Sequence, residues 1–300
     1  MSARTDRSAS ALTFTGQNPG VWLRLAPAML IVVPLMALAV GLAVVQSFGI
    51  FPVTGRSNPS LEAYRTLISS SEFWRSLTFS AYIATISTAL SLAIGVGVAV
   101  AFRTVFSTKR TSTFFLQLNL AIPHLVGALA MLLLLGQSGL LSRVTNAAGV
   151  TDGTIGFPAL VFDSAGLAII AEYVWKEVPF FAVVSLAILG TVAVDYESVA
   201  GTLGAGRIQR FRHVTIPLLL PALLPAAVAV FAFAFGTFEV PLLLGGTFPQ
   251  ALPVLAYRRF VNVDLAARPE AMAAGVVIIV VGLVAALAYQ RLAATLRTRQ

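Results

Sequence analysis

The chain has 300 residues, of which 58% are hydrophobic and only 11% are charged. Soluble domains carry about 25% charged residues, so this composition excludes an ordinary soluble fold and favours a chain dissolved in lipid. A formal charge of +8 would suggest nucleic acid in a soluble protein, but in a membrane protein the position of the charges has to be considered first. The absence of cysteine excludes disulfides, thiolate metal sites and cysteine nucleophiles.

Apolar runs of about 20 residues, the length that crosses a hydrocarbon core about 30 Å thick, recur along the chain. The first 20 residues are polar, and no small-residue cleavage site closes the apolar run after them, so we interpret that run as a retained span and not as a signal peptide. The chain is therefore predicted to be an all-α membrane protein. Its six predicted transmembrane helices cover residues 26–48, 77–102, 113–136, 165–189, 217–243 and 270–290.

The basic residues between these spans predict the orientation of the chain, because Lys and Arg concentrate in cytoplasmic flanks. One set of flanks holds twelve of the 20 basic residues: Arg4, Arg7, Arg24, Arg103, Lys109, Arg110, Arg207, Arg210, Arg212, Arg291, Arg297 and Arg299. The opposite flanks hold seven: Arg56, Arg65, Arg75, Arg143, Arg258, Arg259 and Arg268. Both termini are therefore predicted to be cytoplasmic, and topology explains the excess positive charge without nucleic-acid binding.

We expect one membrane domain without internal repeats. Residues 1–25 and 291–300 form its cytoplasmic tails, and residues 26–60 form its first transmembrane helix and an outer loop. Residues 61–290 form a core with five transmembrane helices. Within the core, a basic cytoplasmic loop at about 195–217 joins the fourth and fifth spans.

The sequence offers no residues for nucleotide or metal chemistry. A phosphate-binding loop needs a Gly-rich turn that ends in Lys-Ser or Lys-Thr, but Lys109 follows Ser-Thr and Lys176 lies in an apolar span. The only histidines, His124 and His213, form no paired zinc site and adjoin no nucleophile elbow. We therefore expect neither a cofactor nor enzymatic activity in this chain, and we interpret His124 as a helix-packing residue in preference to a solute contact.

The fourth predicted span contains three charged residues, Glu172, Lys176 and Glu177. A charge at the bilayer centre costs roughly 2.5–3.5 kcal/mol, so these side chains are expected to face protein or water. Glu172 and Lys176 are four residues apart with the acid first, which is the favourable order for an ion pair, and Pro179 is expected to kink the helix. The residues either lock the helix bundle or line a solute pathway, and the sequence leaves both interpretations open.

Glu239 lies in the fifth predicted span without a local partner. Pro241, Gly245 and Gly246 follow it and are expected to end the helix. An unpaired acid beside a broken helix is a candidate pathway residue, and an ionised carboxylate there would favour a cationic solute. The alternative is an acid near the outer interface that reaches water.

The basic loop contains the stretch GTLGAGRIQRFRHVTIPLLLP. One stripe with helical spacing is formed by Ala200, Gly204, Ile208 and Phe211. The three glycines of the stretch favour a turn between two short helices, and Pro217 suits the first turn of the next helix. These features predict either a docking helix pair or a basic loop that rests on anionic lipid.

The segment DYESVAGTLGAGRIQRFRHVTIPLLLP resembles the cytoplasmic EAA loop of permease subunits in ATP-binding-cassette (ABC) importers. With the family spacing kept, the matching residues are the Gly204-Ala205 pair, the aromatic Phe211, the aliphatic Val214 and the closing Ile216-Pro217. The start departs from the pattern, because Ser198 and Val199 stand at the first Glu and Ala positions, Ala200 stands at the second Ala, and Glu197 lies one residue early. Similarity to the family covers most of the chain from Leu61 onward.

The resemblance implies a type I ABC importer permease. In this family two permeases pair, the EAA loop sits in a groove of a cytoplasmic ATPase that binds the ATP, and an external solute-binding protein delivers the solute. The partners implied are an ATP-binding subunit dimer, an identical or sister permease, the solute-binding protein and the lipid bilayer. The residues implied to couple the chain to the ATPase are Glu197, Ala200, Gly204, Ala205, Arg207, Phe211 and Pro217.

We therefore expect a permease subunit of an ATP-driven, binding-protein-dependent importer in the inner (cytoplasmic) membrane. The segment around the fifth span resembles permeases of the polyamine, thiamine, sulfate and iron type at least as much as the sugar type, and Glu239 favours a cation such as a polyamine. One alternative is an ion-gradient-driven secondary transporter with Glu172, Glu177 or Glu239 as a relay. A membrane-embedded enzyme is the third alternative, for which the sequence shows no catalytic set.

Overall fold

The computed structural model describes residues 19–50, 58–108, 110–153, 156–190 and 193–297. Within these ranges the regular elements are helices, and no strand occurs, so the predicted all-α class is confirmed. The predicted tails lie mostly outside the described residues.

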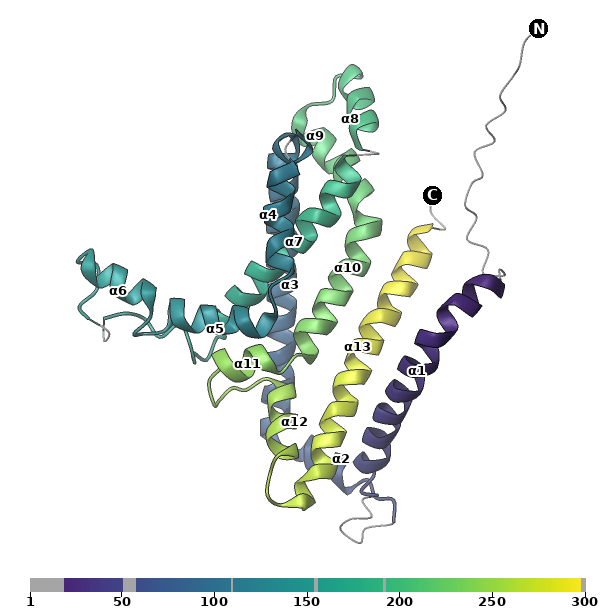
Figure 1. The fold of residues 1–300 in the computed structure, drawn as a ribbon, viewed down its shortest axis with the longest axis vertical. Helices are drawn as coiled ribbons and strands as arrows, with labels where there is room; N and C mark the ends of the chain where they lie inside the picture. Colours follow the sequence, from purple (N-terminus) through teal and green to yellow (C-terminus); the bar gives the residue numbers. More distant parts are fainter. Residues whose placement is uncertain (1–18, 51–57, 109, 154–155, 191–192, 298–300) are drawn as a thin grey trace.

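Four long helices run along the long axis of the molecule (Figure 1): α1 (Pro19–Ser47), α3 (Ser71–Thr108), α10 (Ile216–Gly236) and α13 (Arg268–Arg297). A fifth helix, α7 (Leu167–Leu189), packs against both α3 and α10. Their apolar sequence suits long helices, because a helix satisfies its own backbone hydrogen bonds wherever water is absent. Helix α1 continues through Pro27 and Pro34, and α10 continues through Pro221 and Pro225.

Shorter helices complete the chain at both ends and along one side of the bundle. Before α7 these are α2 (Glu62–Ser69), α4 (Arg110–Leu120), α5 (His124–Leu135) and α6 (Leu140–Ala147). After α7 they are α8 (Ala193–Thr202), α9 (Arg207–Arg210), the π-helical turn η2 (Phe211–Thr215), α11 (Glu239–Leu244), α12 (Leu252–Phe260) and the 3-10 turn η3 (Leu265–Ala267). Helices α8 and α9 lie at one end of the molecule, and α2 and α12 lie near the other (Figure 1).

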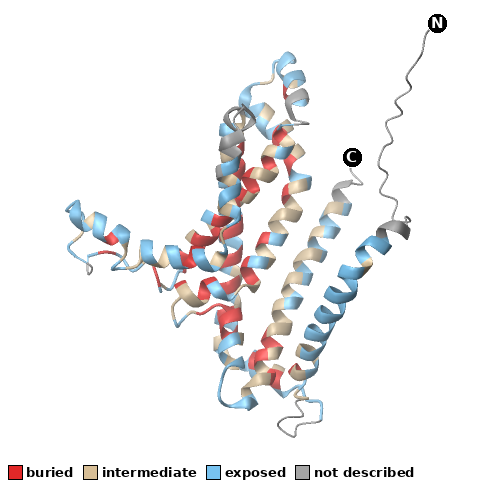
Figure 2. Ribbon diagram, in the orientation of Figure 1, coloured by how far each residue is buried: buried red, intermediate tan, exposed pale blue. Residues whose placement is uncertain are grey.

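Burial is concentrated where α3, α7 and α10 meet, and α1 is exposed along most of its length (Figure 2). The largest fully buried side chains include Tyr173 and Phe181 of α7 and Phe235 of α10. Helix α1 packs against α13 and presents its leucines and valines outward. In a membrane that outward face contacts lipid, which accounts for apolar surface that a soluble protein would have to bury.

By length and composition, the described residues contain five stretches able to cross a membrane: Trp22–Ser47, Ser71–Arg103, His124–Ala147, Arg207–Gly236 and Leu265–Ala294. The fourth predicted span, which forms α7, is not among them because it carries three charged residues in its middle. Pro179 lies inside α7, which continues through it to Leu189.

Two of the predicted spans are wrong as continuous helices. The span predicted at 113–136 is divided between α4 and α5 at residues 121–123, and α5 turns across the long axis that α4 follows (Figure 1). Pro123 explains the break, because a proline disfavours helical geometry in the residue before it. The span predicted at 217–243 ends at Gly236, and the short helix α11 runs from Glu239 to Leu244. The predicted end at Gly245 is therefore confirmed, but a further break at 237–238 precedes Glu239.

Close packing between α3 and α7 depends on Gly95. A Cβ atom added at Gly95 would lie 2.6 Å from Cβ of Phe181 and 2.9 Å from the carbonyl oxygen of Val178. Since the second contact is with backbone, a side-chain rotation cannot relieve it, and the two helices would have to move apart.

Gly95→Ala is therefore expected to destabilise the chain by about 1–3 kcal/mol, the usual effect of overfilling a packed interior. The measurement is the thermal unfolding midpoint of the detergent-solubilised chain. Gly97→Ala is the matched control, because no atom lies within 4 Å of its added Cβ and both substitutions gain the same helix propensity. Equal midpoints for the two variants would contradict the packing role of Gly95.

A cluster of charged groups holds α12 against α3 and α13 near the end opposite α8 and α9. Arg259 donates to Glu270 at 2.5 Å and to Glu72 at 3.3 Å, and Gln250 also donates to Glu72 at 2.9 Å. The backbone N–H of Leu252 donates to the Ser80 hydroxyl at 2.7 Å. Residues far apart in the sequence are thereby fixed to one another at this end of the bundle.

Candidate functional site

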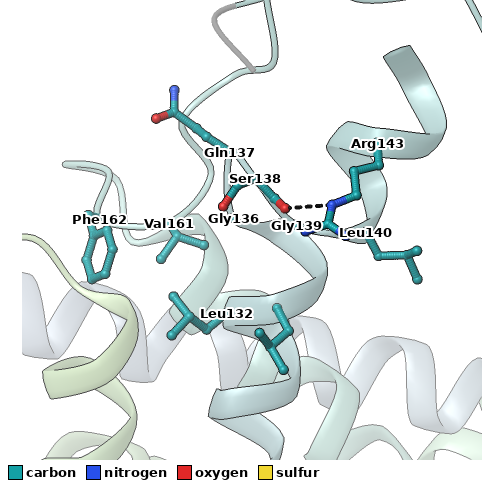
Figure 3. Close-up of a pocket in the computed structure, with 10 residues that line it drawn as sticks. Leu132, Gly136, Gln137, Ser138, Gly139, Leu140, Arg143, Val161 and Phe162 are labelled. Carbon is teal, nitrogen blue, oxygen red and sulfur yellow. Dashed lines mark hydrogen bonds between the residues drawn. The ribbon is translucent and has the colours of Figure 1, made fainter. Parts of the chain in front are cut away.

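An open cavity of about 800 Å³ lies beside the turn between α5 and α6 (Figure 3). Leu132, Val161 and Phe162 form one part of its wall, and the turn 136–139 with Arg143 forms another. The Nε atom of Arg143 donates to the Ser138 carbonyl at 3.1 Å, which fixes the guanidinium against the turn. The cavity is large enough for a small solute, and it adjoins the broken helices described next.

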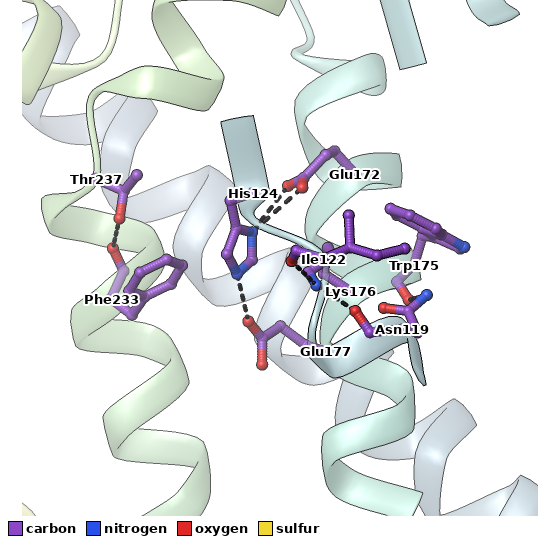
Figure 4. Close-up of polar contacts among 9 residues, drawn as sticks. All are labelled: Asn119, Ile122, His124, Glu172, Trp175, Lys176, Glu177, Phe233 and Thr237. Carbon is purple, nitrogen blue, oxygen red and sulfur yellow. Dashed lines mark hydrogen bonds and ion pairs between the residues drawn. The ribbon is translucent and has the colours of Figure 1, made fainter. Parts of the chain in front are cut away.

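Lys176 does not form the predicted ion pair with Glu172. Its ammonium group instead donates to the carbonyl oxygens of Asn119 and Ile122, both at 2.6 Å, where α4 ends (Figure 4). The last carbonyls of a helix lack partners within that helix and carry partial negative charge, so a lysine there both completes the hydrogen bonds and balances the charge. Lys176 thereby makes two charge-assisted hydrogen bonds at once, one of them to the Asn119 carbonyl, which also accepts from the Ile122 N–H at 3.2 Å.

Glu172 is 0% exposed and lies against the first turn of α5. Its Oε1 atom would be 2.8 Å from a Cβ added at Gly127, so only a glycine permits this approach. Nδ1 of His124 lies 3.2 Å from the same oxygen, and Nε2 of His124 lies 3.5 Å from Oε1 of Glu177 (Figure 4). The predicted packing role of His124 is therefore incomplete, because its ring bridges two carboxylates of α7.

Glu239 begins α11 directly after the break that ends α10, and its side chain is exposed. The ring of His124 lies 4.7 Å from that of Phe233 on α10, so the two helix breaks lie close together. The structure thus brings four predicted pathway residues, Glu172, Lys176, Glu177 and Glu239, to one region of broken helices. Within the described residues, no group of three or more acidic or histidine side chains is suited to hold a metal ion.

Non-helical backbone is expensive inside a lipid bilayer unless protein or a water-filled cavity surrounds it. The breaks at 121–123 and 237–238 leave such backbone between apolar helices. Lys176 satisfies part of it, and the exposed Glu239 requires water. The region therefore requires protein or water around it.

The basic loop at the α8 end forms the predicted turn between two short helices. Gly204 adopts a left-handed conformation with φ of 84°, and the Gln209 side chain accepts from the Gly206 N–H at 3.0 Å. The stripe through Ala200 and Phe211 is therefore not continuous on one helix, because the chain reverses at Gly204. Pro217 lies in the first turn of α10, as predicted.

The tip of this loop exposes two large apolar side chains: Ile208, which belongs to the predicted stripe, and Leu203, which the sequence pattern did not single out. Leu203 is 83% exposed and Ile208 is 82% exposed, one on each side of the turn. Phe211 is 38% exposed. Arg207, which lies between Leu203 and Ile208 in the sequence, is also exposed. The sequence could have indicated this apolar tip, because apolar residues flank the Gly-Ala-Gly turn and the tip of a surface loop ordinarily carries polar residues.

Glu197, one residue early in the EAA pattern, anchors the loop to the membrane helices. Its Oε1 accepts from the Thr215 hydroxyl and its Oε2 accepts from Nη1 of Arg103, both at 2.6 Å. Burial raises the pKa of Glu197, but the hydrogen bonds from Thr215 and Arg103 and the nearby positive charges outweigh it, so the pKa is lowered from 4.5. The carboxylate therefore ties α8 to the end of α3 and to the turn before α10.

Glu197→Gln is expected to reduce the protection of the loop amides about tenfold in hydrogen–deuterium exchange, since hydrogen bonds to a carboxylate contribute about 1.5–3 kcal/mol and the half-exposed Arg103 contributes less. Because its folded-state pKa is lowered, Glu197 stabilises the loop above pH 4.5 and the effect is lost as the pH falls through the lowered pKa. Glu62→Gln, an exposed acid in α2, is the control. Unchanged exchange in Glu197→Gln would contradict the anchor.

Comparison with known proteins identifies one family that matches more than half of the chain. The family model described as "Binding-protein-dependent transport system inner membrane component" matches residues 91–298. The molybdenum transport system permease protein ModB of Mycobacterium tuberculosis is 30% identical over 182 residues, which cover 60% of this chain and 65% of the relative. The trehalose/maltose transport system permease protein MalF of Thermococcus litoralis is 27% identical over 191 residues, covering 63% of each chain. The chain thus spans slightly less than two thirds of the length of these relatives.

Two solved structures share the fold. A bacterial ABC transporter involved in the import of the acidic polysaccharide alginate matches with a TM-score of 0.73 and 17% identity, over 92% of this chain and 94% of the other. The bacterial alginate ABC transporter in complex with an alginate pentasaccharide-bound periplasmic protein matches with a TM-score of 0.69 and 19% identity, over 90% and 91% of the two chains. The arrangement of helices in Figure 1 is therefore shared with these two transporters.

Proposed function

Because the chain belongs to the inner membrane components of binding-protein-dependent transport systems, the permeases of ABC importers, we propose that its α8–α9 loop couples it to a cytoplasmic ATPase subunit. The observation that carries this proposal is the exposed apolar pair, Leu203 and Ile208, on a loop fixed by Glu197 to α3 and α10. A rigid loop with apolar anchors suits a groove in a partner protein better than a lipid headgroup layer, which would favour basic residues at the tip. ATP binding and hydrolysis then belong to the partner.

The loop assignment supports the predicted topology. The start of α1 and the end of α13 point toward the end of the molecule that carries α8 and α9 (Figure 1). If the α8–α9 loop is cytoplasmic, both termini are therefore cytoplasmic as well. We place the chain in the inner (cytoplasmic) membrane, with the tails, the first helix and outer loop, and the core at the boundaries predicted from the sequence. A second permease subunit and an extracytoplasmic solute-binding protein complete the assembly.

The region of broken helices is the proposed solute pathway. Glu172, Lys176 and Glu177 give it polar groups at the depth of apolar helices, and the exposed Glu239 adds an unpaired carboxylate. That carboxylate favours a cationic solute, such as a polyamine. The relatives reported above are named for molybdenum and for trehalose or maltose, so the cationic solute rests on Glu239 alone.

The test is purification of the tagged chain in mild detergent, followed by mass spectrometry and uptake assays in vesicles. We expect an ATPase subunit to accompany the chain, and uptake to require ATP and the solute-binding protein. Uptake that proceeds without ATP and collapses with the ion gradient would contradict the proposal and favour the secondary transporter.

A further inference from the structure

His124 lies between two carboxylates that belong to one neighbouring helix. Nδ1 of the ring faces Glu172 at 3.2 Å and Nε2 faces Glu177 at 3.5 Å, while Phe233 covers the ring at 4.7 Å between centroids. His124 is the first residue of α5, and both acids belong to α7. The bridge therefore joins the start of α5, just after the helix break, to the centre of the bundle (Figure 4).

The bridge from His124 to Glu172 and Glu177 is favourable on both sides only with one additional proton. A neutral histidine between two ionised carboxylates lacks that proton. A neutral imidazole has one N–H donor and one acceptor nitrogen, so it satisfies one carboxylate and turns a lone pair toward the other. Both contacts are favourable if the ring is an imidazolium, or if one of the two acids is protonated and donates to a neutral ring. The proton count of the group is the same in either arrangement.

The charge balance of the surroundings favours that additional proton. With it, His124, Glu172, Glu177 and the adjacent Lys176 together carry no net charge; without it, they carry one negative charge. Unbalanced charge is costly where water is scarce.

Few other charged groups face this cluster. Helix α4 contributes the neutral Asn119, α10 contributes Phe233, α7 adds the buried Tyr173, and α11 adds the exposed Glu239. Helix α3 has no charged residue between Arg75 and Arg103.

We propose that His124 is a positioning residue for transport, which holds α5 against α7 only while the bridge carries its proton. Loss of the proton turns one contact repulsive and releases the start of α5. Because α5 begins at the broken helices of the proposed pathway and also forms a wall of the open cavity beside the turn 136–139, its release changes the shape of both. This consequence for transport rests on the proposed function, whereas the proton-dependent contact between α5 and α7 does not.

Trp175 provides a direct measure of that contact. Its Cζ3 atom would be 3.1 Å from a Cβ added at Gly127, so the indole packs on the backbone of α5. With Trp22→Phe and Trp74→Phe, the full chain in lipid nanodiscs retains Trp175 as its single tryptophan. We expect its fluorescence to change with pH as a one-proton titration.

Two substitutions in the single-tryptophan chain separate a proton-dependent bridge from simple packing. His124→Gln removes the titrating ring, and its fluorescence is expected to be independent of pH. Glu177→Gln keeps the contact without the proton, because a neutral ring can donate to Glu172 and accept from the amide, so its fluorescence should keep the low-pH value throughout. His213→Gln, at the only other histidine, is the control that should retain the titration.

A flat pH profile in the parent chain would overturn the proposal, and so would a titration that persists in His124→Gln or in Glu177→Gln. The measurement uses no solute and no ATPase. Its failure would therefore leave the importer assignment intact, while failure of ATP-dependent uptake would leave the bridge intact.

Discussion

A permease that carries both Leu203→Asp and Ile208→Asp is expected to insert into the membrane normally and to lose its ATPase partner. Burying an aliphatic side chain of this size contributes roughly 1.5–3 kcal/mol, and each 1.4 kcal/mol is about a tenfold change in affinity. Placing two carboxylates in an apolar groove adds a desolvation penalty. The expected loss of affinity for the ATPase is therefore at least about 100-fold.

Co-purification with the ATPase, followed by titration of the two purified subunits, measures this loss. Val261→Asp with Val263→Asp is the matched control, since these two valines are also exposed but lie next to α12, near the other end of the molecule. The control should keep full affinity. If the Leu203 and Ile208 variant still binds the ATPase as tightly as the parent, the loop does not dock through its tip.

Lys176→Met is expected to be the most destabilising single change in the region of broken helices. It removes two charge-assisted hydrogen bonds of 2.6 Å, to the carbonyls of Asn119 and Ile122, each worth about 1.5–3 kcal/mol. A loss of about 3 kcal/mol corresponds to a fall of roughly 6–12 °C in the thermal midpoint, at about 2–4 °C per kcal/mol. Solute uptake is expected to fall together with the thermal midpoint, because Lys176 no longer holds the backbone just before α5 in place.

Lys176→Arg keeps the charge and the donors, so it should recover part of both stability and uptake. Arg258→Met removes an exposed cation from α12 and should leave the thermal midpoint within about 1 °C of the parent, as is usual for surface substitutions. The carbonyl contact would have no energetic importance if Lys176→Met unfolded at the parent's midpoint.

The sequence predicted most of the helices and the turn in the basic loop, because each depends on neighbouring residues. Long apolar runs predict spans, and the glycines at 201, 204 and 206 predict a reversal that the left-handed Gly204 confirms. The predicted third and fifth spans were wrong as single helices. Pro123 marks the first break, and Gly236 and Pro241 flank the second, at 237–238, since a proline removes the hydrogen bond to the carbonyl four residues earlier. The sequence does not distinguish these prolines from Pro221 and Pro225, which lie inside α10 without ending it.

The candidate pathway residues were found from the sequence, but their partners were not. Glu172 and Lys176 have the spacing of an intrahelical ion pair, yet Lys176 contacts Asn119 and Ile122, more than 50 residues earlier. His124 was interpreted as a packing residue because nothing near it in the sequence indicates two carboxylates. Glu197 similarly gains Arg103 and Thr215 only when α8 folds back on α3 and α10.

The sequence by itself therefore determined the class of the protein, the approximate position of its helices and the resemblance to importer permeases. These properties depend on hydrophobicity, spacing and turn residues, which act over a few residues at a time. Tertiary structure alone decided which carbonyls Lys176 contacts, which acids His124 bridges and which apolar side chains stay exposed at the tip of the loop. Such contacts join segments distant in the chain, because a buried charge pairs with whichever polar group folding brings within hydrogen-bond distance.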